Sequence, residues 1–320
     1  MDIHILVDNL TNPALLFFVL GVFAAQIKSD LKIPENSSKF ISLYLLFSIG
    51  FKGGQELAHS TFGSDIVWAV VIGILLALLV PLYTYYILRL KFSVHNAGAI
   101  SAAYGSVSAV TFVTAISYLE IENIPFGGHM VAVMALMEAP SIIVGVLLMR
   151  IYSNQNKSAS GMSKLIRHAV TNGSVLLILG SLAIGYQASD EQAAGIAPFT
   201  TDIFKGFLAV FLLDMGITSG KQLSAFLKKG WFALLFAIVI PIINGTLIAF
   251  ITRFLDMEIG DRFLLSILAA SASYIAVPAA LRVAAPRANP SLYLPMALAI
   301  TFPFNITLGM PVYMAVVQGF

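Results

Sequence analysis

The sequence contains no cysteine and few charged residues. Without cysteine the protein has no disulfides, no thiolate metal sites and no cysteine nucleophile. Charged residues make up 11% of the 320 residues, against about 25% in soluble domains, while 58% are hydrophobic. The mean hydropathy is +0.90. Because so little polar surface cannot cover a water-soluble globule, we predict an all-α, multi-pass membrane protein.

Motifs of several other protein classes are also missing. No phosphate-binding Gly-Lys-Ser/Thr loop is present, which argues against an ATP-driven pump, and there is no basic stripe for nucleic acid. The five histidines fall at predicted helix ends or in loops, and no pair of them has metal-ligand spacing. No intramembrane hydrolase motif appears, so we expect no enzyme activity and no resident cofactor. The acidic start, 1–11, predicts no cleavable signal peptide.

Ten segments are apolar enough to be candidate membrane spans, since a spanning helix needs about 20 mostly apolar residues. They are 12–27, 37–59, 65–89, 95–119, 127–152, 164–187, 199–222, 230–254, 260–284 and 291–318.

The loop charges predict the orientation of these segments. Cytoplasmic loops carry an excess of lysine and arginine. Only Arg253 and Arg262 fall in loops of the opposite set, which otherwise carry acidic residues such as Glu120 and Asp190. We therefore expect both termini outside. Alternate loops hold 14 of the 18 basic residues: Lys28, Lys32, Lys39, Arg89, Lys91, Arg150, Lys157, Lys164, Arg167, Lys221, Lys228, Lys229, Arg282 and Arg287.

The two halves of the chain resemble each other in sequence. Residues 1–152 would form a first five-helix repeat, 153–163 a polar cytoplasmic linker, and 164–320 a second repeat. Five is an odd number, so the second repeat must be inverted, as in many secondary transporters. The matched positions are Ile49–Leu57 with Met215–Leu223, and Trp68, Pro81 and Arg89 with Trp231, Pro241 and Arg253.

Two polar stretches, 101–111 and 269–278, interrupt the fourth and ninth segments at corresponding places. They predict helices broken at the bilayer midplane, where unwound backbone is allowed if it lines a cavity. The N-terminus of each following half-helix would favour an anion. Alternatively, the small residues only let helices pack closely. The candidate substrate-binding residues are Gly105, Ser106, Ser108, Thr111, Ser271 and Ser273.

We interpret four charged residues as intramembrane: Lys52, Glu56, Glu138 and Asp214. Such residues are functional candidates in a membrane. Glu138 precedes Pro140, which frees a backbone carbonyl, so this position suits Na⁺ or a transferable proton. Lys52 can pair with Glu56 on its own helix or with Asp214 across the repeat, while Glu56 and Asp214 can instead snorkel to water. The corresponding region of the second half, 301–305, is polar but uncharged.

Several motifs between Ile41 and Val317 resemble the sodium-dependent bicarbonate transporter family, best known from cyanobacteria. The motifs are Ile49-Gly-Phe-Lys-Gly-Gly54, Tyr104-Gly-Ser-Val-Ser-Ala-Val-Thr111, Glu138-Ala-Pro140, and Ala270-Ser…Pro278…Leu281-Arg282 followed by Pro286-Arg-Ala-Asn-Pro-Ser-Leu-Tyr293.

The resemblance implies ten helices in two inverted repeats that together form a core and a gate domain, usually in a homotrimer. It implies bicarbonate uptake driven by Na⁺ in an elevator-like movement, with the anion between the half-helix ends and Glu138 as a Na⁺ ligand. It also implies a bacterial plasma (inner) membrane location and a cytoplasmic PII-like regulatory protein, although the 153–163 loop is shorter than in cyanobacterial members. The expected cation-binding or coupling residues are Glu138, Ser101, Tyr274, Thr301, Asn305 and Lys52.

The sequence departs from the family pattern at two positions. Tyr274 stands where cyanobacterial members have an acidic residue, and Lys52 stands where an uncharged polar residue is usual. An ammonium can replace Na⁺, so one hypothesis is that the chain has lost a Na⁺ site and couples to H⁺ through Glu138. The alternatives to bicarbonate transport are another small carboxylate or organic anion as cargo, or a non-transporting membrane receptor or scaffold.

Overall fold

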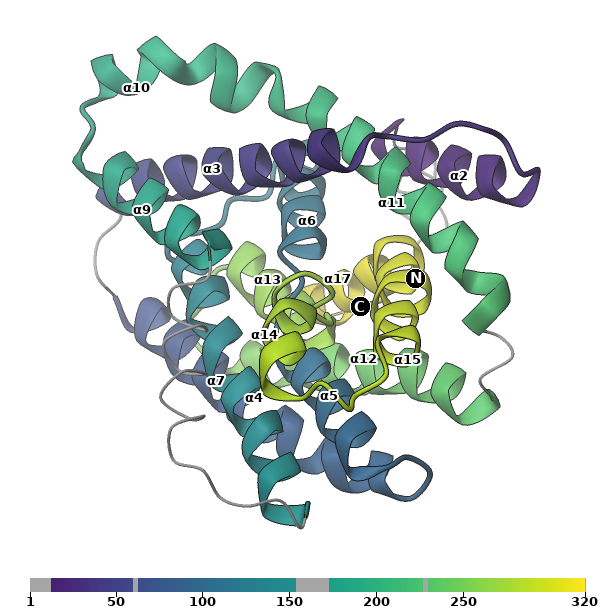
Figure 1. Ribbon diagram of the computed structural model, residues 1–320. Coiled ribbons are helices and arrows are strands. Elements are labelled where there is room, and N and C mark those ends of the chain that lie inside the picture. The colour runs from purple at the N-terminus through teal and green to yellow at the C-terminus, as the bar shows by residue number, and fades with distance from the viewer. Residues whose placement is uncertain (1–12, 60–62, 154–172, 227–229, 320) are drawn as a thin grey trace.

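The computed structural model describes residues 13–59, 63–153, 173–226 and 230–319, and every regular element in them is helical (Figure 1). Parts of two predicted spans and five of the predicted cytoplasmic basic residues, Lys157, Lys164, Arg167, Lys228 and Lys229, lie outside these ranges. Within the described residues, six helical segments are long and apolar enough to cross a membrane, and two more apolar helices are shorter. The chain is thus an all-helical, multi-pass membrane protein, as the composition predicts.

The first half contains α2 (Pro13–Gln26), α3 (Glu35–His59), α4 (Ser64–Arg89), α5 (Val94–Gly105), α6 (Ala109–Ile121) and α7 (His129–Tyr152). The second half contains α9 (Gly173–Gln187), α10 (Asp190–Ala197), the π-helix η1 (Pro198–Asp202), α11 (Phe204–Phe226), α12 (Trp231–Ile251), the 3₁₀-helix η3 (Thr252–Phe254), α13 (Ile259–Ala270) and α14 (Ala276–Ala284). It ends with α15 (Pro290–Pro295), the π-helix η4 (Met296–Thr301), α16 (Phe302–Phe304), the π-helix η5 (Asn305–Gly309) and α17 (Met310–Gln318).

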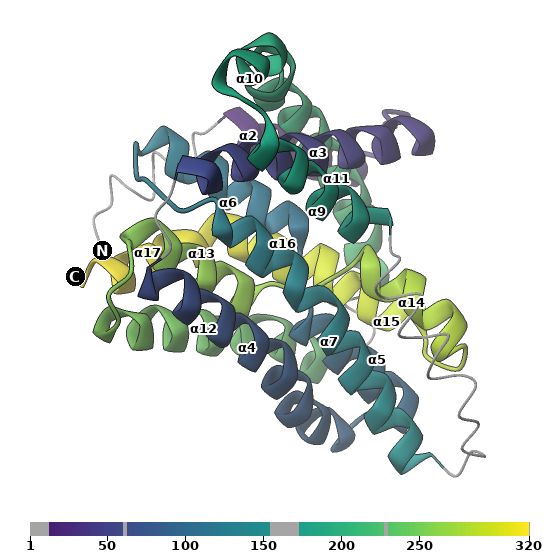
Figure 2. The ribbon, with the colours of Figure 1, turned by 90° about the vertical axis from the view of Figure 1, so that its left-hand side faces the viewer.

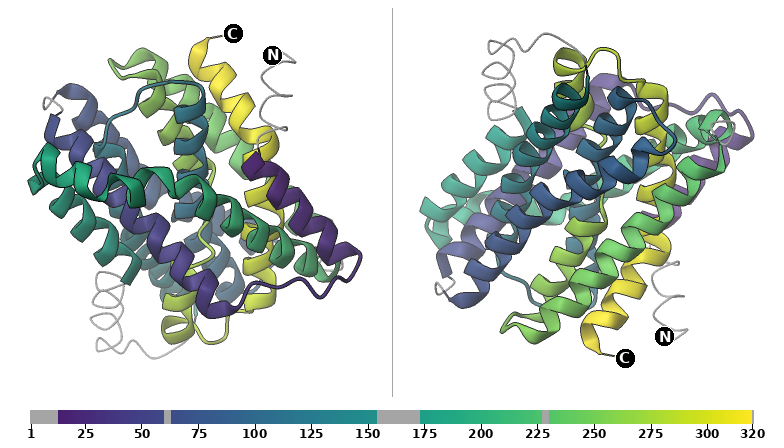
Figure 3. Two further views of the ribbon diagram at one scale, coloured as in Figure 1. Left: turned by 90° about the horizontal axis from the view of Figure 1, so that it is seen from above. Right: turned by 90° about the horizontal axis from the view of Figure 1, so that it is seen from below.

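The helices form two layers (Figures 1 and 2). We call one the α3 layer: it consists of α2, α3, α9 and α11, with α2 packed along α11 and α3 along α9. We call the other the α7 layer: it consists of α4 to α7 and α12 to α17 with the short helices between them. The view from above in Figure 3 shows the α3 layer lying across the helices of the α7 layer. Helix α10 lies on the side of the α3 layer that faces away from the α7 layer (Figure 2).

Glycines bring the helix backbones of the α3 layer into direct contact. A Cβ added to Gly21 would overlap the backbone of α11 around Gly216, and a Cβ on Gly54 would overlap the backbone of α9 around Gly185. Close approach through small residues is a common way to pack helices in lipid, where hydrophobic burial contributes little. Small residues thus serve close packing in the α3 layer.

The last predicted span, 291–318, is irregular rather than one uniform α-helix. It contains two π-helical turns, η4 and η5, on either side of the short α16. Pro295, Pro303 and Pro311 lie along it, and a proline removes one backbone donor from the helical ladder. π-Turns inside helices occur frequently at functional sites. Helix α10, between the sixth and seventh predicted spans, is a further helix that the hydropathy pattern does not predict, while η1 overlaps the start of the seventh predicted span, 199–222.

Candidate functional site

The first helix break separates α5 from α6. Helix α5 ends at Gly105, and 106–108 are non-helical. Ser108 is the N-cap of α6, because its hydroxyl accepts a hydrogen bond from the backbone N–H of Thr111 at 3.2 Å. The break therefore falls inside the polar stretch that the sequence identifies.

Gly105 is held in a tight corner of the α7 layer. A Cβ at this position would overlap the hydroxyl of Ser141 on α7 and the ring of Pro81 on α4. The Ser141 hydroxyl also donates to the carbonyl of Ala102, at 3.2 Å. Helices α4 and α7 thus close around the end of α5, and Gly105 serves this packing.

The second break separates α13 from α14. Helix α13 ends at Ala270, and 271–275 are non-helical. The Ser273 hydroxyl accepts from the backbone N–H of Val277 in the first turn of α14, at 3.4 Å. The Asn305 amide donates to the carbonyl of Ala270 at 2.8 Å and so satisfies an acceptor that the end of α13 exposes.

The two breaks are hydrogen-bonded to each other. The backbone N–H of Ser108 donates to the Ser271 hydroxyl at 3.0 Å. The backbone N–H of Ser273 donates to the carbonyl of Ala103 at 2.8 Å. All four residues are buried. Polar backbone at this depth is tolerated because each break supplies partners to the other.

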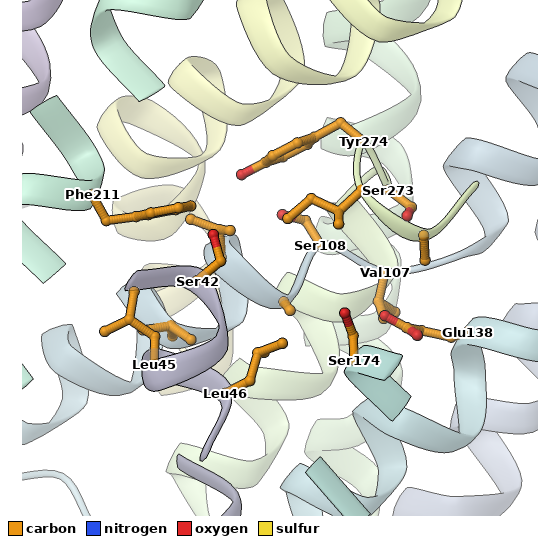
Figure 4. A pocket seen from close by; sticks show the side chains of 15 residues that line it. Ser42, Leu45, Leu46, Val107, Ser108, Glu138, Ser174, Phe211, Ser273 and Tyr274 are labelled. Carbon is orange, nitrogen blue, oxygen red and sulfur yellow. The ribbon is translucent and has the colours of Figure 1, made fainter. Parts of the chain in front are cut away.

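A pocket opens at these breaks, between the two layers (Figure 4). The first residues of α6 and α14 line it together, and α3, α9 and α11 form the facing wall. Its volume is about 20 Å³, enough for about one water-sized particle. The lining residues are Ser42, Leu45, Leu46, Val107, Ser108, Ala109, Val110, Val113, Glu138, Ser174, Phe211, Ser273, Tyr274, Ile275 and Ala276.

Polar atoms around the pocket lack partners within the described residues. The hydroxyls of Ser106 and Thr111 and the Oε2 atom of Glu138 are buried and make no hydrogen bond. Glu138 is only 5% exposed. An unsatisfied buried polar group costs about 1–3 kcal/mol, more if it is charged, so such atoms in one place are candidate contacts for a ligand. The N-termini of α6 and α14, each with about half a positive charge, add attraction for an anion.

The predicted substrate-binding residues are brought together. Ser108 and Ser273 line the pocket, while Ser106, Thr111 and Ser271 are buried within or beside the breaks. Among the predicted coupling residues, Glu138 and Tyr274 line the pocket, and Figure 4 shows both side chains beside the breaks.

Two predicted coupling residues hold other hydrogen bonds. The Thr301 hydroxyl donates to the carbonyl of Ala237 at 2.7 Å and accepts from Tyr104 at 2.7 Å. The Ser101 hydroxyl donates to the carbonyl of Gly98 at 3.0 Å. Neither residue lines the pocket, so in this conformation both support the surrounding helices rather than contact a ligand there.

Lys52 lies in a different cavity. Its ammonium forms an ion pair with Glu120 on α6, at 2.5 Å, rather than with Glu56 or Asp214. Asp214 instead accepts a hydrogen bond from Ser38, at 2.5 Å. The Lys52 cavity has a volume of about 260 Å³ and is lined by Ile49, Lys52, Gly53, Glu56, Ile116, Glu120, Ile124, Pro125, Phe126, Val131 and Phe204.

The sequence does not single out the pocket wall contributed by the α3 layer. Ser42 of α3, Ser174 of α9 and Phe211 of α11 lie on apolar helices with no local motif. Their position opposite the breaks depends on how the two layers meet, and no pattern along the chain encodes that.

Comparison with known proteins gives one finding. Residues 13–318 match the family model described as the Na⁺-dependent bicarbonate transporter superfamily. The match covers both helix breaks and Glu138. A comparison with curated proteins found no match.

Proposed function

This chain belongs to the Na⁺-dependent bicarbonate transporter superfamily, and from that premise we propose that it is a secondary active transporter that imports a small anion. Bicarbonate is the cargo and Na⁺ the driving cation that the family favours, with H⁺ as the alternative coupling ion. One observation carries the proposal: two half-helix N-termini and a buried carboxylate share one pocket between two helix layers, and the Oε2 atom of that carboxylate has no hydrogen-bond partner in the described part of the chain.

The anion would bind at the first turns of α6 and α14. Free backbone N–H groups and the helix dipole favour negative charge at both ends. The unpaired hydroxyls of Ser106 and Thr111 supply further donors, since a hydroxyl rotates its hydrogen toward an acceptor. Ser108 and Ser273 already cap their half-helices. We expect them to orient the first turns while the ligand occupies the space beyond.

The cation would bind near Glu138. Carboxylate and hydroxyl oxygens are the ligands that hard cations prefer. Glu138 Oε2 has no hydrogen-bond partner among the described residues, so it is open to Na⁺ or to a proton. A cation at this carboxylate would also attract the anion across the same small pocket. This shared attraction is a physical basis for symport, because each ion then binds more tightly when the other is present.

Alternating access would occur by movement of the α7 layer against the α3 layer. Both broken helices and Glu138 belong to the α7 layer, while Ser42 and Phe211 of the α3 layer complete the wall. The 20 Å³ pocket is too small for an anion of several atoms. Sliding of the layers would enlarge it toward one side of the membrane and then the other, in an elevator-like cycle.

We further propose ten spans in two inverted repeats with both termini outside. Packing between the two halves supports this arrangement. The first helix of each half packs on the second helix of the other half: α2 on α11, and α9 on α3. The contacts also correspond. Gly21 meets Gly216, and in the other pair Ser181 meets Gly50 at the matching place. An approximate two-fold axis between the repeats would produce this pairing.

Uptake of labelled bicarbonate into proteoliposomes tests the proposal, with an inward Na⁺ gradient and separately with a pH gradient alone. We expect uptake that requires Na⁺ and is strongly reduced in Glu138→Gln. The matched control is Glu191→Gln, which changes an exposed acid on α10 and leaves uptake unchanged.

Two outcomes would contradict different parts of the proposal. Folded protein that takes up no bicarbonate, yet is thermally stabilised by another small anion, would overturn the cargo and keep the transporter. No uptake and no stabilisation by any small anion would overturn transport itself and favour a receptor or scaffold.

A further inference from the structure

Three helix starts of the α7 layer meet at a cluster of titratable side chains, away from the pocket. Asp65 lies in the first turn of α4, His129 begins α7, and Asp261 lies in the first turn of α13. One ligand-type atom from each residue lies within 4.8 Å of the other two. His129 and Asp261 are buried, and Asp65 is partly buried. The cluster thus gathers two carboxylates and an imidazole from three helices distant in sequence.

The distance between the side chains of His129 and Asp261 is longer than that of a hydrogen bond. His129 Nε2 lies 3.5 Å from Asp261 Oδ2, beyond the usual N–H···O limit of about 3.2 Å. This nitrogen is buried and has no hydrogen-bond partner among the residues that the structure describes, and His129 is 3% exposed. Two ligands of a tetrahedral zinc ion with bonds of about 2.0–2.1 Å lie roughly 3.4 Å apart. The observed separation therefore fits two ligands around an ion.

Asp261 is held in position by its other oxygen. Asp261 Oδ1 accepts a hydrogen bond from the backbone N–H of Gly127 at 2.7 Å, which leaves Oδ2 directed at His129. A hydrogen bond of this kind, from the protein to the far side of a ligand, orients metal ligands in known sites. The neighbouring Arg262 does not neutralise the cluster, because its guanidinium donates to the carbonyl of Val317.

The cluster carries excess negative charge. His129 is the positively chargeable group that faces Asp261, and the two carboxylates of Asp65 and Glu258 act on Asp261 in the opposite sense. Within the described ranges, no lysine or arginine forms an ion pair with Asp65 or Asp261. Buried carboxylates are usually paired or coordinate a metal. A divalent cation would supply the missing positive charge.

We propose that Asp65, His129 and Asp261 form a binding site for a divalent transition metal of the zinc class. One nitrogen and two oxygens are ligands that Zn²⁺ accepts, and water would complete four-coordination. The ion joins the starts of α4, α7 and α13. It thereby holds the 122–128 loop, whose Pro125 and Phe126 line the cavity of Lys52. The site is separate from the transport pocket.

Metal titration of purified, chelator-treated protein in detergent tests this proposal, after removal of any histidine tag. We expect one Zn²⁺ per chain by calorimetry and a higher unfolding temperature on addition of Zn²⁺. Co²⁺ should give the visible absorption bands of a four-coordinate ion. His129→Gln and Asp65→Asn should each weaken the affinity by more than about tenfold.

The control variant is His59→Gln. His59 and Asp190 form another His–Asp pair, at 3.2 Å, but both side chains are exposed and no third ligand accompanies them within the described ranges. This variant should bind Zn²⁺ like the parent. Absence of stoichiometric binding by the parent would overturn the proposal, as would parental affinity in both His129→Gln and Asp65→Asn. Binding of Ca²⁺ or Mg²⁺ in place of Zn²⁺ would overturn the metal class. None of these readouts requires transport, so failure here is distinguishable from failure of the proposed function.

Discussion

Removal of the ion pair between Lys52 and Glu120 should make the two helix layers separate more readily. Lys52 lies on α3 of the α3 layer, and Glu120 lies near the end of α6 in the α7 layer. The two charged atoms are 2.5 Å apart, and the side chains are 32% and 23% exposed. Because solvent screens a pair exposed to this degree, its contribution is about 1 kcal/mol. Lys52→Gln should therefore shift the equilibrium away from this conformation about fivefold.

The missing cysteines make this shift measurable. A single cysteine in place of Leu45, which lines the closed pocket and is only 2% exposed, becomes accessible to a water-soluble maleimide only when the layers part. In that background we expect Lys52→Gln to raise the labelling rate about fivefold. Glu120→Gln should raise the labelling rate by the same factor. The double variant should label no faster than either single variant, as a double-mutant cycle requires for a coupled pair.

The control is Lys91→Gln, which removes an exposed positive charge at the end of α4 and should leave the labelling rate unchanged. Labelling within twofold of the parent in both single variants would refute the role of the pair. Fully additive effects in the double variant would show that the two charges act independently, and would refute it equally.

Three further variants test the packing and the breaks, each by thermal or denaturant unfolding in detergent. Gly54→Ala, which places a Cβ against the α9 backbone, should cost about 1–3 kcal/mol, whereas Gly180→Ala, with open space around it, should not destabilise. Ser108→Ala should lose the N-cap of α6, about 1 kcal/mol, and should also reduce the stabilisation given by the anion. Asn305→Leu leaves the carbonyl of Ala270 without its partner and should cost about 1–3 kcal/mol; an unchanged unfolding midpoint would contradict the assigned hydrogen bond.

The helix breaks could be predicted from sequence because their cause is local. Runs of glycine and serine weaken a helix wherever they occur, and Ser108 provides a cap three residues before Thr111. The observed breaks fall within the two predicted polar stretches. Glu138 was equally visible, because a single acid in an apolar segment stands out without any knowledge of its neighbours.

Partners across the layers could not be predicted in the same way. Lys52 had two predicted acidic partners, Glu56 by spacing along the helix and Asp214 by its place in the second repeat. It pairs instead with Glu120, whose position depends on how α6 meets α3. The cluster at His129 was missed for a similar reason. Its two carboxylates come from other helices, so a search for ligand spacing within one segment finds nothing.

The charge of the pocket limits how transport can be coupled. Among the described residues that line it, Glu138 is the single acid. A monovalent anion beside an ionised Glu138 leaves two negative charges, and each unpaired charge is costly in a membrane. Two cations would neutralise the loaded pocket, and one net positive charge would then enter per cycle. The membrane potential contributes about 2.3 kcal/mol per charge per 100 mV, so parental accumulation should rise about 50-fold at 100 mV. With Glu138→Gln one cation suffices, and any residual uptake should ignore the potential. Equal potential dependence in parent and variant would refute this charge balance and place the coupling elsewhere than Glu138.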